Sequence, residues 1–507
     1  MIFLFMILFT FLMETQAVTL LKTELHFNNN HKYYYTNINV GSQESPARMI
    51  IDTSYGSSYV YAKDCVGCYY VSSNPYYKYN SSTLSPISCG NSLCQSDTCH
   101  RYSCRGTCHA STKACCSKSD NSLCAYAISF LDNTIIDGSL IRDNIMIQTA
   151  TGYTQSYPTT FGYIDYSTRN NYQADGILGL GYRTTGCDPS CINTYLDDMV
   201  ENINGVRDMF TICFGNTQGV LTYGGIDEDL YSGNITWVDF IATGFYTVEL
   251  NDFRVNENHF FNSTETMLIY ISSLPYVIRL QSNLYDALVI YLKTYYCYLY
   301  GICKQYSIFE NYCLLDRPSS SWPTIDIYLN DIHLSLSSGL YFQTIFQNNK
   351  YLYCFVITRE DPDVNYSTFG ASFMRGFTLI HDRGHNRIGI ATPTNACHAQ
   401  VVGGIHMIIP TPSPTSAPSP TPAPVEDNTD VLVIILISCS VVVVVVCGVI
   451  IIVTCCRYYK SIQQFPTEES KADHKSLDTS KQSSKSQELP TIHSNQQSDS
   501  TADNTTI

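Results

Sequence analysis

Residues 34–53 contain Tyr34-x-x-Asn-Ile-x-Val-Gly41, followed by Met49-Ile-Ile-Asp52-Thr53. Both are short runs of β-branched and aromatic residues, and a glycine or a polar pair closes each run, which is typical of β-strands. The same texture recurs along residues 18–398, for example at 246–250 and 377–382, whereas helical spacing is sparse and clearest at Leu284–Leu292. The sequence predicts a mainly all-β fold. A segment of about 380 residues exceeds one ordinary core, so two lobes are expected.

Apolar runs mark both ends of the chain. Residues 1–17 begin with an apolar stretch too short to cross a bilayer, which indicates a signal peptide ending near Ala17. Residues 431–456 carry no charge and are long enough for a transmembrane helix. Arg457 and Lys460 follow directly, as the positive-inside rule expects of a cytosolic flank. We expect a single-pass type I membrane protein whose ectodomain is extracellular or endomembrane-lumenal.

The segments beside the expected span are polar and of low complexity. Residues 399–430 include a Pro, Ser and Thr run from Pro410 to Pro424 and should form an extended stalk. Residues 457–507 are rich in Ser, Gln, Lys and Asp and should form a disordered cytosolic tail. The net charge of −15 is unlike a basic nucleic-acid footprint, so no nucleic-acid partner is expected.

Cysteine usage agrees with an ectodomain outside the cytosol. Of the 22 cysteines, 18 precede the expected span, and many fall in the dense stretch 65–124. A zinc cluster that includes His100 or His109 is an alternative, but an oxidising compartment favours disulfides, so no metal and no cofactor are expected. The disulfide pairing stays open. Four Asn-x-Ser/Thr sequons predict glycosylation, at Asn80, Asn234, Asn262 and Asn365.

A series of motifs resembles the pepsin-like aspartic peptidase family in its order along the chain. The opening segment places Asp52 at the first catalytic aspartate. It is followed by Cys124-x-Tyr126-x-Ile128, by the glycine-rich DGILGLG segment of residues 175–181, and by Asp382-Arg383-x-x-Asn386-Arg-Ile-Gly389-Ile-Ala391. The Cys-rich insertion after Asp52 resembles the nepenthesin-like branch. The resemblance implies a bilobal fold with an interlobe cleft, an N-terminal lobe over 18–208 and a C-terminal lobe over 209–398.

In that family two aspartates, one from each lobe, share a proton and activate a water between them. Each lies in an Asp-Thr/Ser-Gly-Thr/Ser turn, where glycine permits close backbone approach. Here the first turn reads Asp52-Thr53-Ser54-Tyr55. Counting back from Tyr285-Asp-Ala-Leu288 places Ser272-Ser273-Leu274-Pro275 at the second turn, after a strand expected at Met267–Ile271. Ser272 then stands at the position of the second aspartate.

The active-site flap also departs from the family pattern, because Phe130-Leu-Asp132-Asn-Thr134 stands where Tyr-Gly-Asp-Gly-Ser is expected. The resemblance assigns substrate contacts to Thr53, Phe130, Asp132 and Ser273. We expect a catalytically inactive or impaired homologue that binds a peptide or protein in its cleft. One alternative is an active aspartic endopeptidase working at acidic pH. Another is an adhesive or structural surface glycoprotein, which a cleft blocked by Tyr55 and Leu274 would favour.

Overall fold

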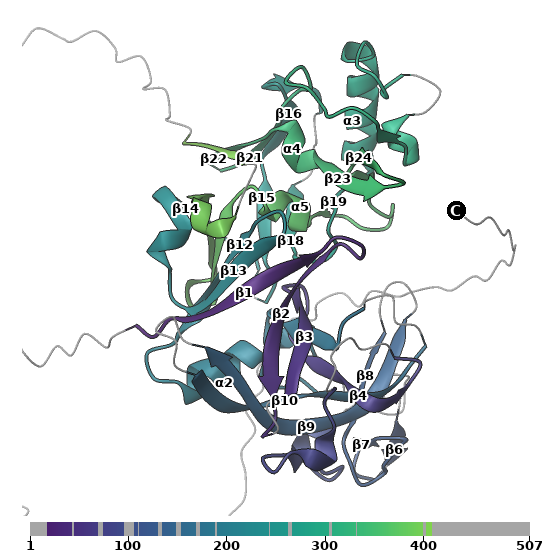
Figure 1. The fold of residues 1–507 in the computed structure, drawn as a ribbon, viewed down its shortest axis with the longest axis vertical. Coiled ribbons are helices and arrows are strands. Elements are labelled where there is room, and N and C mark those ends of the chain that lie inside the picture. Colours follow the sequence, from purple (N-terminus) through teal and green to yellow (C-terminus); the bar gives the residue numbers. More distant parts are fainter. Residues whose placement is uncertain are drawn as a thin grey trace, which may run out of the picture. The chain divides into compact units, whose positions relative to one another are not determined.

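The computed structural model describes residues 18–407, except 43–44, 69–74, 96–105, 110, 130–133, 149–153, 169–172, 188–189, 243, 262–265, 304–306, 331 and 399–401. Strands dominate this part of the chain, in two lobes that share one long sheet (Figure 1). The mainly β, bilobal prediction is therefore confirmed. Residues 408–507, which include the expected transmembrane helix, lie outside the described residues. No helix of the described part is long and apolar enough to cross a membrane.

The shared sheet runs from the C-terminal lobe into the N-terminal lobe. Its central strand pairs antiparallel with one strand of each lobe and so ties the two lobes together through the backbone. The strands, in spatial order, are β14 (Tyr231–Asp239), β28 (Arg387–Pro393), β27 (Thr378–Asp382), β12 (Arg207–Phe214), β13 (Gln218–Gly224), the central β1 (Leu21–Asn28), β2 (Tyr33–Val40), β3 (Ser45–Asp52), β11 (Gly176–Gly179), β4 (Tyr59–Val66), β10 (Thr154–Ser167), β9 (Ile135–Gln148) and β5 (Ser85–Pro86), with β8 (Ala125–Ser129) against β9.

The other sheets are smaller, and three of them build the rest of the C-terminal lobe. Their orders are β15 (Thr247–Leu250), β18 (Met267–Ile271), β26 (Ser367–Phe369), β19 (Ile278–Leu280) and β25 (Ile357–Arg359); then β17 (Asn258–His259), β16 (Asp252–Val255), β21 (Ile325–Leu329), β22 (Ile332–Leu336) and β29 (Gly404–Met407); then β20 (Cys313–Leu314), β24 (Lys350–Phe355) and β23 (Phe342–Gln347). In the N-terminal lobe β6 (Thr107–His109) pairs with β7 (Ala114–Cys116).

The helices are few, as the sparse helical spacing predicts. α3 (Ser282–Tyr295) contains the expected segment and buries Leu284, Leu288 and Leu292, which share one face at spacings of four. α2 (Tyr195–Asn202) begins at a capping box, in which the Thr194 hydroxyl accepts from the Asp197 amide and the Asp197 carboxylate accepts from the Thr194 amide. α4 (Ser338–Tyr341) and α5 (Ala371–Met374) are single turns.

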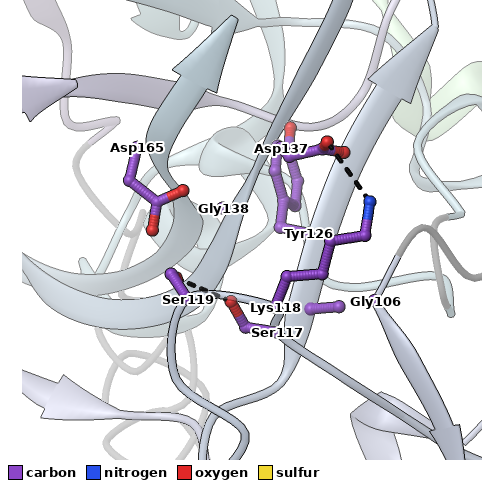
Figure 2. Close-up of a pocket in the computed structure, with 9 residues that line it drawn as sticks. Gly106, Ser117, Lys118, Ser119, Tyr126, Asp137, Gly138 and Asp165 are labelled. Carbon is purple, nitrogen blue, oxygen red and sulfur yellow. Dashed lines mark hydrogen bonds and ion pairs between the residues drawn. The ribbon is translucent and has the colours of Figure 1, made fainter. Parts of the chain in front are cut away.

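The Cys-rich insertion is cross-linked by internal disulfides and joins the N-terminal lobe through the pairing of β5 with β9. Cys65 pairs with Cys68, Cys89 with Cys116, and Cys94 with Cys124. Because Cys89 and Cys116 are joined, they offer no thiolates to a metal beside His109. A cavity of about 20 Å³ is lined by residues of the insertion, of β8 and β9 and by Asp165 (Figure 2). The Lys118 ammonium lies 3.8 Å from the Asp137 carboxylate there. That volume has room for about one water, so it is a packing feature of the docked insertion.

Further disulfides among the described residues join Cys187 to Cys191, Cys213 to Cys397, Cys297 to Cys303 and Cys313 to Cys354. The expected stalk needs a correction at its beginning. Residues 404–407 of that segment form β29, which pairs with β22, and Ile405 packs against the main core. Because β29 pairs with β22 and Ile405 is partly buried, the folded unit reaches Met407 and does not end at residue 398.

Candidate functional site

Two turns occupy equivalent positions in the two lobes. β3 leads to Asp52 and pairs parallel with β11, which also pairs antiparallel with β4. In the C-terminal lobe β18 leads to Ser272 and pairs parallel with β26, which also pairs antiparallel with β19. The same three-strand arrangement therefore presents Asp52 from one lobe and Ser272 from the other.

Two glycines show that the turns correspond residue by residue. A Cβ on Gly179 would lie 2.7 Å from the Tyr55 carbonyl oxygen and 2.5 Å from the Ser57 carbonyl oxygen. These are the third and fifth residues after Asp52. A Cβ on Gly370 would lie 2.1 Å from the Pro275 carbonyl oxygen and 2.2 Å from the Val277 carbonyl oxygen. These are the third and fifth residues after Ser272. Each glycine is required because the turn of its own lobe lies directly against its backbone. This matching places Tyr55 and Pro275 at equivalent positions.

Reciprocal hydrogen bonds join the two turns. The Thr53 amide donates to the Ser273 hydroxyl at 2.9 Å, and the Ser273 amide donates to the Thr53 hydroxyl at 2.9 Å. The Ser273 hydroxyl in turn donates to the Ile51 carbonyl at 2.8 Å. Both side chains are buried, so each bond is made away from competing water. Asp52 and Ser272 directly precede Thr53 and Ser273 in the sequence, so the paired turns bring them together between the lobes. This meeting point of the two turns is called the interlobe junction below.

Asp52 is a buried carboxylate held by its own turn. Its Oδ1 accepts from the Ser54 amide at 2.8 Å and from the Ser54 hydroxyl. Burial raises the pKa of Asp52, and the hydrogen bonds from Ser54 and from the Tyr55 amide oppose that rise. The carboxyl group is therefore biased towards its protonated form by its surroundings, without a second carboxylate among the causes.

Ser272 is fully buried and bonded within its own turn. Its hydroxyl donates to the Leu274 carbonyl and accepts from the Leu274 amide at 3.2 Å, and its amide donates to the Phe369 carbonyl at 3.1 Å. A serine hydroxyl does not ionise in the range in which a carboxylic acid does. This half of the junction has a hydrogen-bonding group and no acid.

Leu274 takes the place where the turn of the resembled family has glycine, and its side chain reaches the other lobe. It is half-buried and packs against the N-terminal-lobe cluster that includes Tyr59 and Ile128. Tyr55, also half-buried, packs against the same cluster. Two bulky side chains therefore fill space beside the junction, where glycine and a small hydroxyl residue would leave it open.

Tyr270 is a site residue that the sequence analysis missed. Its hydroxyl donates to the Ser54 carbonyl at 3.0 Å, and burial together with the nearby Asp52 charge raises its pKa. A signal was present, because residues two apart on a strand share a face and Tyr270 precedes Ser272 by two. The expected contacts Phe130 and Asp132, like the sequon residue Asn262, lie outside the described residues. Asn80, Asn234 and Asn365 are exposed.

A groove of about 630 Å³ lies between the lobes, apart from the interlobe junction, and is called the second groove below. It is lined by α2 and by the turn after β27. Arg383 is buried there: its guanidinium contacts the Asp197 carboxylate, and its Nε lies 3.2 Å from the Asp208 carboxylate. Burial raises the pKa of Asp208, and the Arg383 charge opposes the rise. Asp208 lies on β12, which pairs with β27 in the C-terminal lobe, whereas Asp197 belongs to α2 of the N-terminal lobe. The Arg383–Asp197 ion pair therefore joins the two lobes.

The two equivalent turns, the shared sheet and the interlobe junction define the bilobal class of aspartic-peptidase folds. Comparison with known proteins agrees: the model of the eukaryotic aspartyl protease family matches residues 33–393. The chain belongs to the eukaryotic aspartyl protease family.

Individual relatives are distant. Gastricsin of Rattus norvegicus is 26% identical over 230 residues, which cover 43% of this chain and 54% of that protein. Embryonic pepsinogen of Gallus gallus is 23% identical over 222 residues, which cover 43% of this chain and 52% of that protein. This chain thus spans about half the length of the curated relatives that it matches.

Proposed function

We propose that this chain is a membrane-anchored aspartic-peptidase homologue that binds a peptide or protein in its interlobe cleft and hydrolyses it slowly or not at all. One observation carries the proposal. The reciprocal hydrogen bonds of Thr53 and Ser273 join the two turns, and this pairing supports the assignment of Ser272 to the position of the second aspartate. Misplacement of the second turn would be the main argument for a working enzyme, and the Gly179 and Gly370 contacts speak against it.

The chemistry follows from the missing acid. The aspartic mechanism needs one carboxylate as general base to a water and a second, protonated, carboxyl group to polarise the scissile carbonyl. Asp52 can serve as one of these, and the Ser272 hydroxyl, engaged with Leu274, cannot supply the shared proton. Losing one member of a catalytic unit typically lowers kcat by about 10⁴-fold or more. Binding can persist without it.

The surface context supports an anchored ectodomain. The charge-free run 431–456 and the basic residues after it favour a single span with the folded unit outside the cytosol. Exposure of Asn80, Asn234 and Asn365 suits glycosylation at those sequons. The insertion of residues 65–124, with the disulfides given above, supports placement in the nepenthesin-like branch.

A second candidate is an adhesive or structural surface glycoprotein that does not use the cleft. The packing of Leu274 against the N-terminal lobe favours it, because a filled junction leaves less room for a peptide backbone. Under this candidate a ligand would bind elsewhere, and opening the junction by Leu274→Gly would change nothing in ligand binding. Under cleft binding the same change would alter peptide affinity.

The test is to incubate the purified full-length protein with a diverse peptide library from pH 3 to 7 and to score binding and cleavage separately. Retention of peptides without cleavage, altered by Leu274→Gly, is the expected result. Cleavage that disappears in Asp52→Ala would show a working peptidase. Absence of both binding and cleavage would leave the adhesive candidate.

A further inference from the structure

The second groove has room for a ligand, and both lobes build it. Its volume of about 630 Å³ lies within the range of ordinary ligand sites, ~300–1,000 Å³. The N-terminal lobe contributes Tyr182, which follows β11 closely, and part of α2. The C-terminal lobe contributes Asp208 of β12 and Gly384 of the turn after β27. The lining residues do not include the turns of the interlobe junction, so the groove is a separate site.

Asp208 is a carboxylate that Arg383 neutralises only in part. Its Oδ1 lies 3.2 Å from the Arg383 Nε, but these two atoms make no hydrogen bond of good geometry within the described structure. The same guanidinium also contacts the Asp197 carboxylate, whose Oδ2 accepts from the Thr194 amide at 2.9 Å. One arginine therefore serves two carboxylates. The Asp208 side chain is 36% exposed, so it remains open to a further cation.

Glu201 is the second carboxylate of the groove that is open to a ligand. It lies exposed on α2, and its Oε2 accepts from the Asn193 side-chain amide at 3.1 Å. That donor is neutral. Within the described part of the chain, Glu201 forms no ion pair with a lysine, arginine or histidine. Its charge is therefore available to a cation that enters the groove.

The lining side chains give the groove an excess of negative charge. Asp197, Glu201 and Asp208 supply three carboxylates, against the guanidinium groups of Arg183 and Arg383. The whole chain also has a net charge of −15, which attracts a basic partner from a distance. Charge complementarity therefore favours a cationic occupant.

A basic segment of polypeptide suits the groove better than a metal ion does. Among the described residues, Asp197, Glu201 and Asp208 do not bring three ligand atoms within 4.8 Å of one another, as a shared ion requires. A polypeptide segment carries its charges on separate side chains, so it can reach carboxylates that belong to different lobes. Arginine is the best suited of these side chains, because its planar donors pair with a carboxylate through two hydrogen bonds.

We propose that the second groove binds a basic segment of a partner protein, whose arginine or lysine side chains pair with Glu201 from the N-terminal lobe and Asp208 from the C-terminal lobe. The bound segment lies across both lobes, beside the Arg383–Asp197 ion pair. This site is distinct from the cleft of the proposed function and does not depend on it. Cleavage of peptides at the interlobe junction would refute the proposed function and leave the second groove as a binding site.

The experiment measures binding by fluorescence anisotropy on the purified full-length protein at pH 7. The probes are a labelled, capped peptide of four arginines, its neutral citrulline counterpart, and spermine as a competitor. Glu201→Gln and Asp208→Asn each remove one negative charge from the groove, and Arg183→Gln removes one positive charge. Glu228→Gln, at an exposed glutamate outside the groove, is the matched control. Urea unfolding verifies that each variant is folded.

The arginine peptide should bind, and the citrulline peptide should bind about tenfold more weakly or not at all. Glu201→Gln should weaken binding of the arginine peptide about threefold, and Asp208→Asn, whose carboxylate is less exposed, about tenfold. Arg183→Gln should strengthen it about twofold, and Glu228→Gln should leave it unchanged. Equal binding of both peptides, equal losses in Glu201→Gln and Glu228→Gln, or no binding would overturn the proposal. Spermine that binds as tightly as the arginine peptide would assign the groove to a free polyamine and overturn the partner-protein assignment.

Discussion

His381 is a neutral imidazole inside the core, and replacing it should stabilise the protein most at acidic pH. It lies on β27 with its side chain fully buried. Its ring stacks on Phe210 at a centroid distance of 4.4 Å and meets the edge of Tyr246 at 4.7 Å. Neither ring nitrogen makes a hydrogen bond of good geometry in the described part of the chain, and a looser contact with the Leu379 backbone opposes the fall in pKa. Burial lowers the pKa of His381 to about 3 from an ordinary value of 6.5.

The direction in which stability changes with pH follows from proton linkage. The unfolded chain binds the proton more tightly than the folded protein, so stability falls as the pH drops below about 6.5 and levels off below about 3. From those two pKa values, the loss relative to pH 8 is about 2 kcal/mol at pH 5 and about 3 kcal/mol at pH 4. His381→Phe removes this loss and preserves the aromatic stack.

The assay is urea unfolding of the wild type and His381→Phe at pH 4, 5 and 8. The free-energy difference between the two proteins cancels the other titrating groups, which both contain. The variant should be more stable at pH 8 through loss of two unpaired buried nitrogens, and its advantage should grow by about 3 kcal/mol down to pH 4. A difference that does not change between pH 8 and pH 4 would refute the reasoning.

Three further predictions concern the junction and the second groove. Ser273→Ala should lower the free energy of unfolding by about 2 kcal/mol, because it leaves a buried amide and a buried carbonyl of the other turn unpaired; equal stability in urea would contradict this. Arg383→Gln should lower the free energy of unfolding by about 1–3 kcal/mol, because it removes a buried guanidinium from two partly exposed carboxylates; the exposed control is Arg183→Gln. Asp52→Asn should stabilise the protein near neutral pH, since the raised pKa penalises the ionised carboxylate, with the gain vanishing towards pH 3 in the same unfolding assay.

Local sequence patterns predicted the elements that form the site. The expected strand Met267–Ile271 is β18 without change, and the expected helix at Leu284–Leu292 lies inside α3. Both have strong local signals: a β-branched and aromatic run before a serine pair, and leucines spaced by four. The family pattern also placed the Asp52 and Ser272 turns at equivalent positions of the two lobes. It assigned Thr53 and Ser273 to substrate contacts and did not predict the reciprocal hydrogen bonds between them.

Features that depend on distant residues could not be read from the sequence. Thr53 and Ser273 are 220 positions apart, and only the folded lobes bring their hydroxyl and amide groups within hydrogen-bond distance. The isolation of His381 depends on the packing of neighbouring strands. β29 was assigned to the stalk because its residues adjoin a Pro-rich run, and only pairing with β22 gives its apolar face a place to pack.

The most direct test of the central claim compares the peptidase activity of the wild type, Ser272→Asp and Ser272→Asp/Leu274→Gly at pH 3 to 5, with folding verified by urea unfolding. If one missing carboxylate and one obstructing leucine account for the loss of catalysis, the wild type shows no Asp52-dependent cleavage and the double variant gains it. Cleavage by the wild type that Asp52→Ala abolishes, at a rate the double variant does not exceed, would contradict the account.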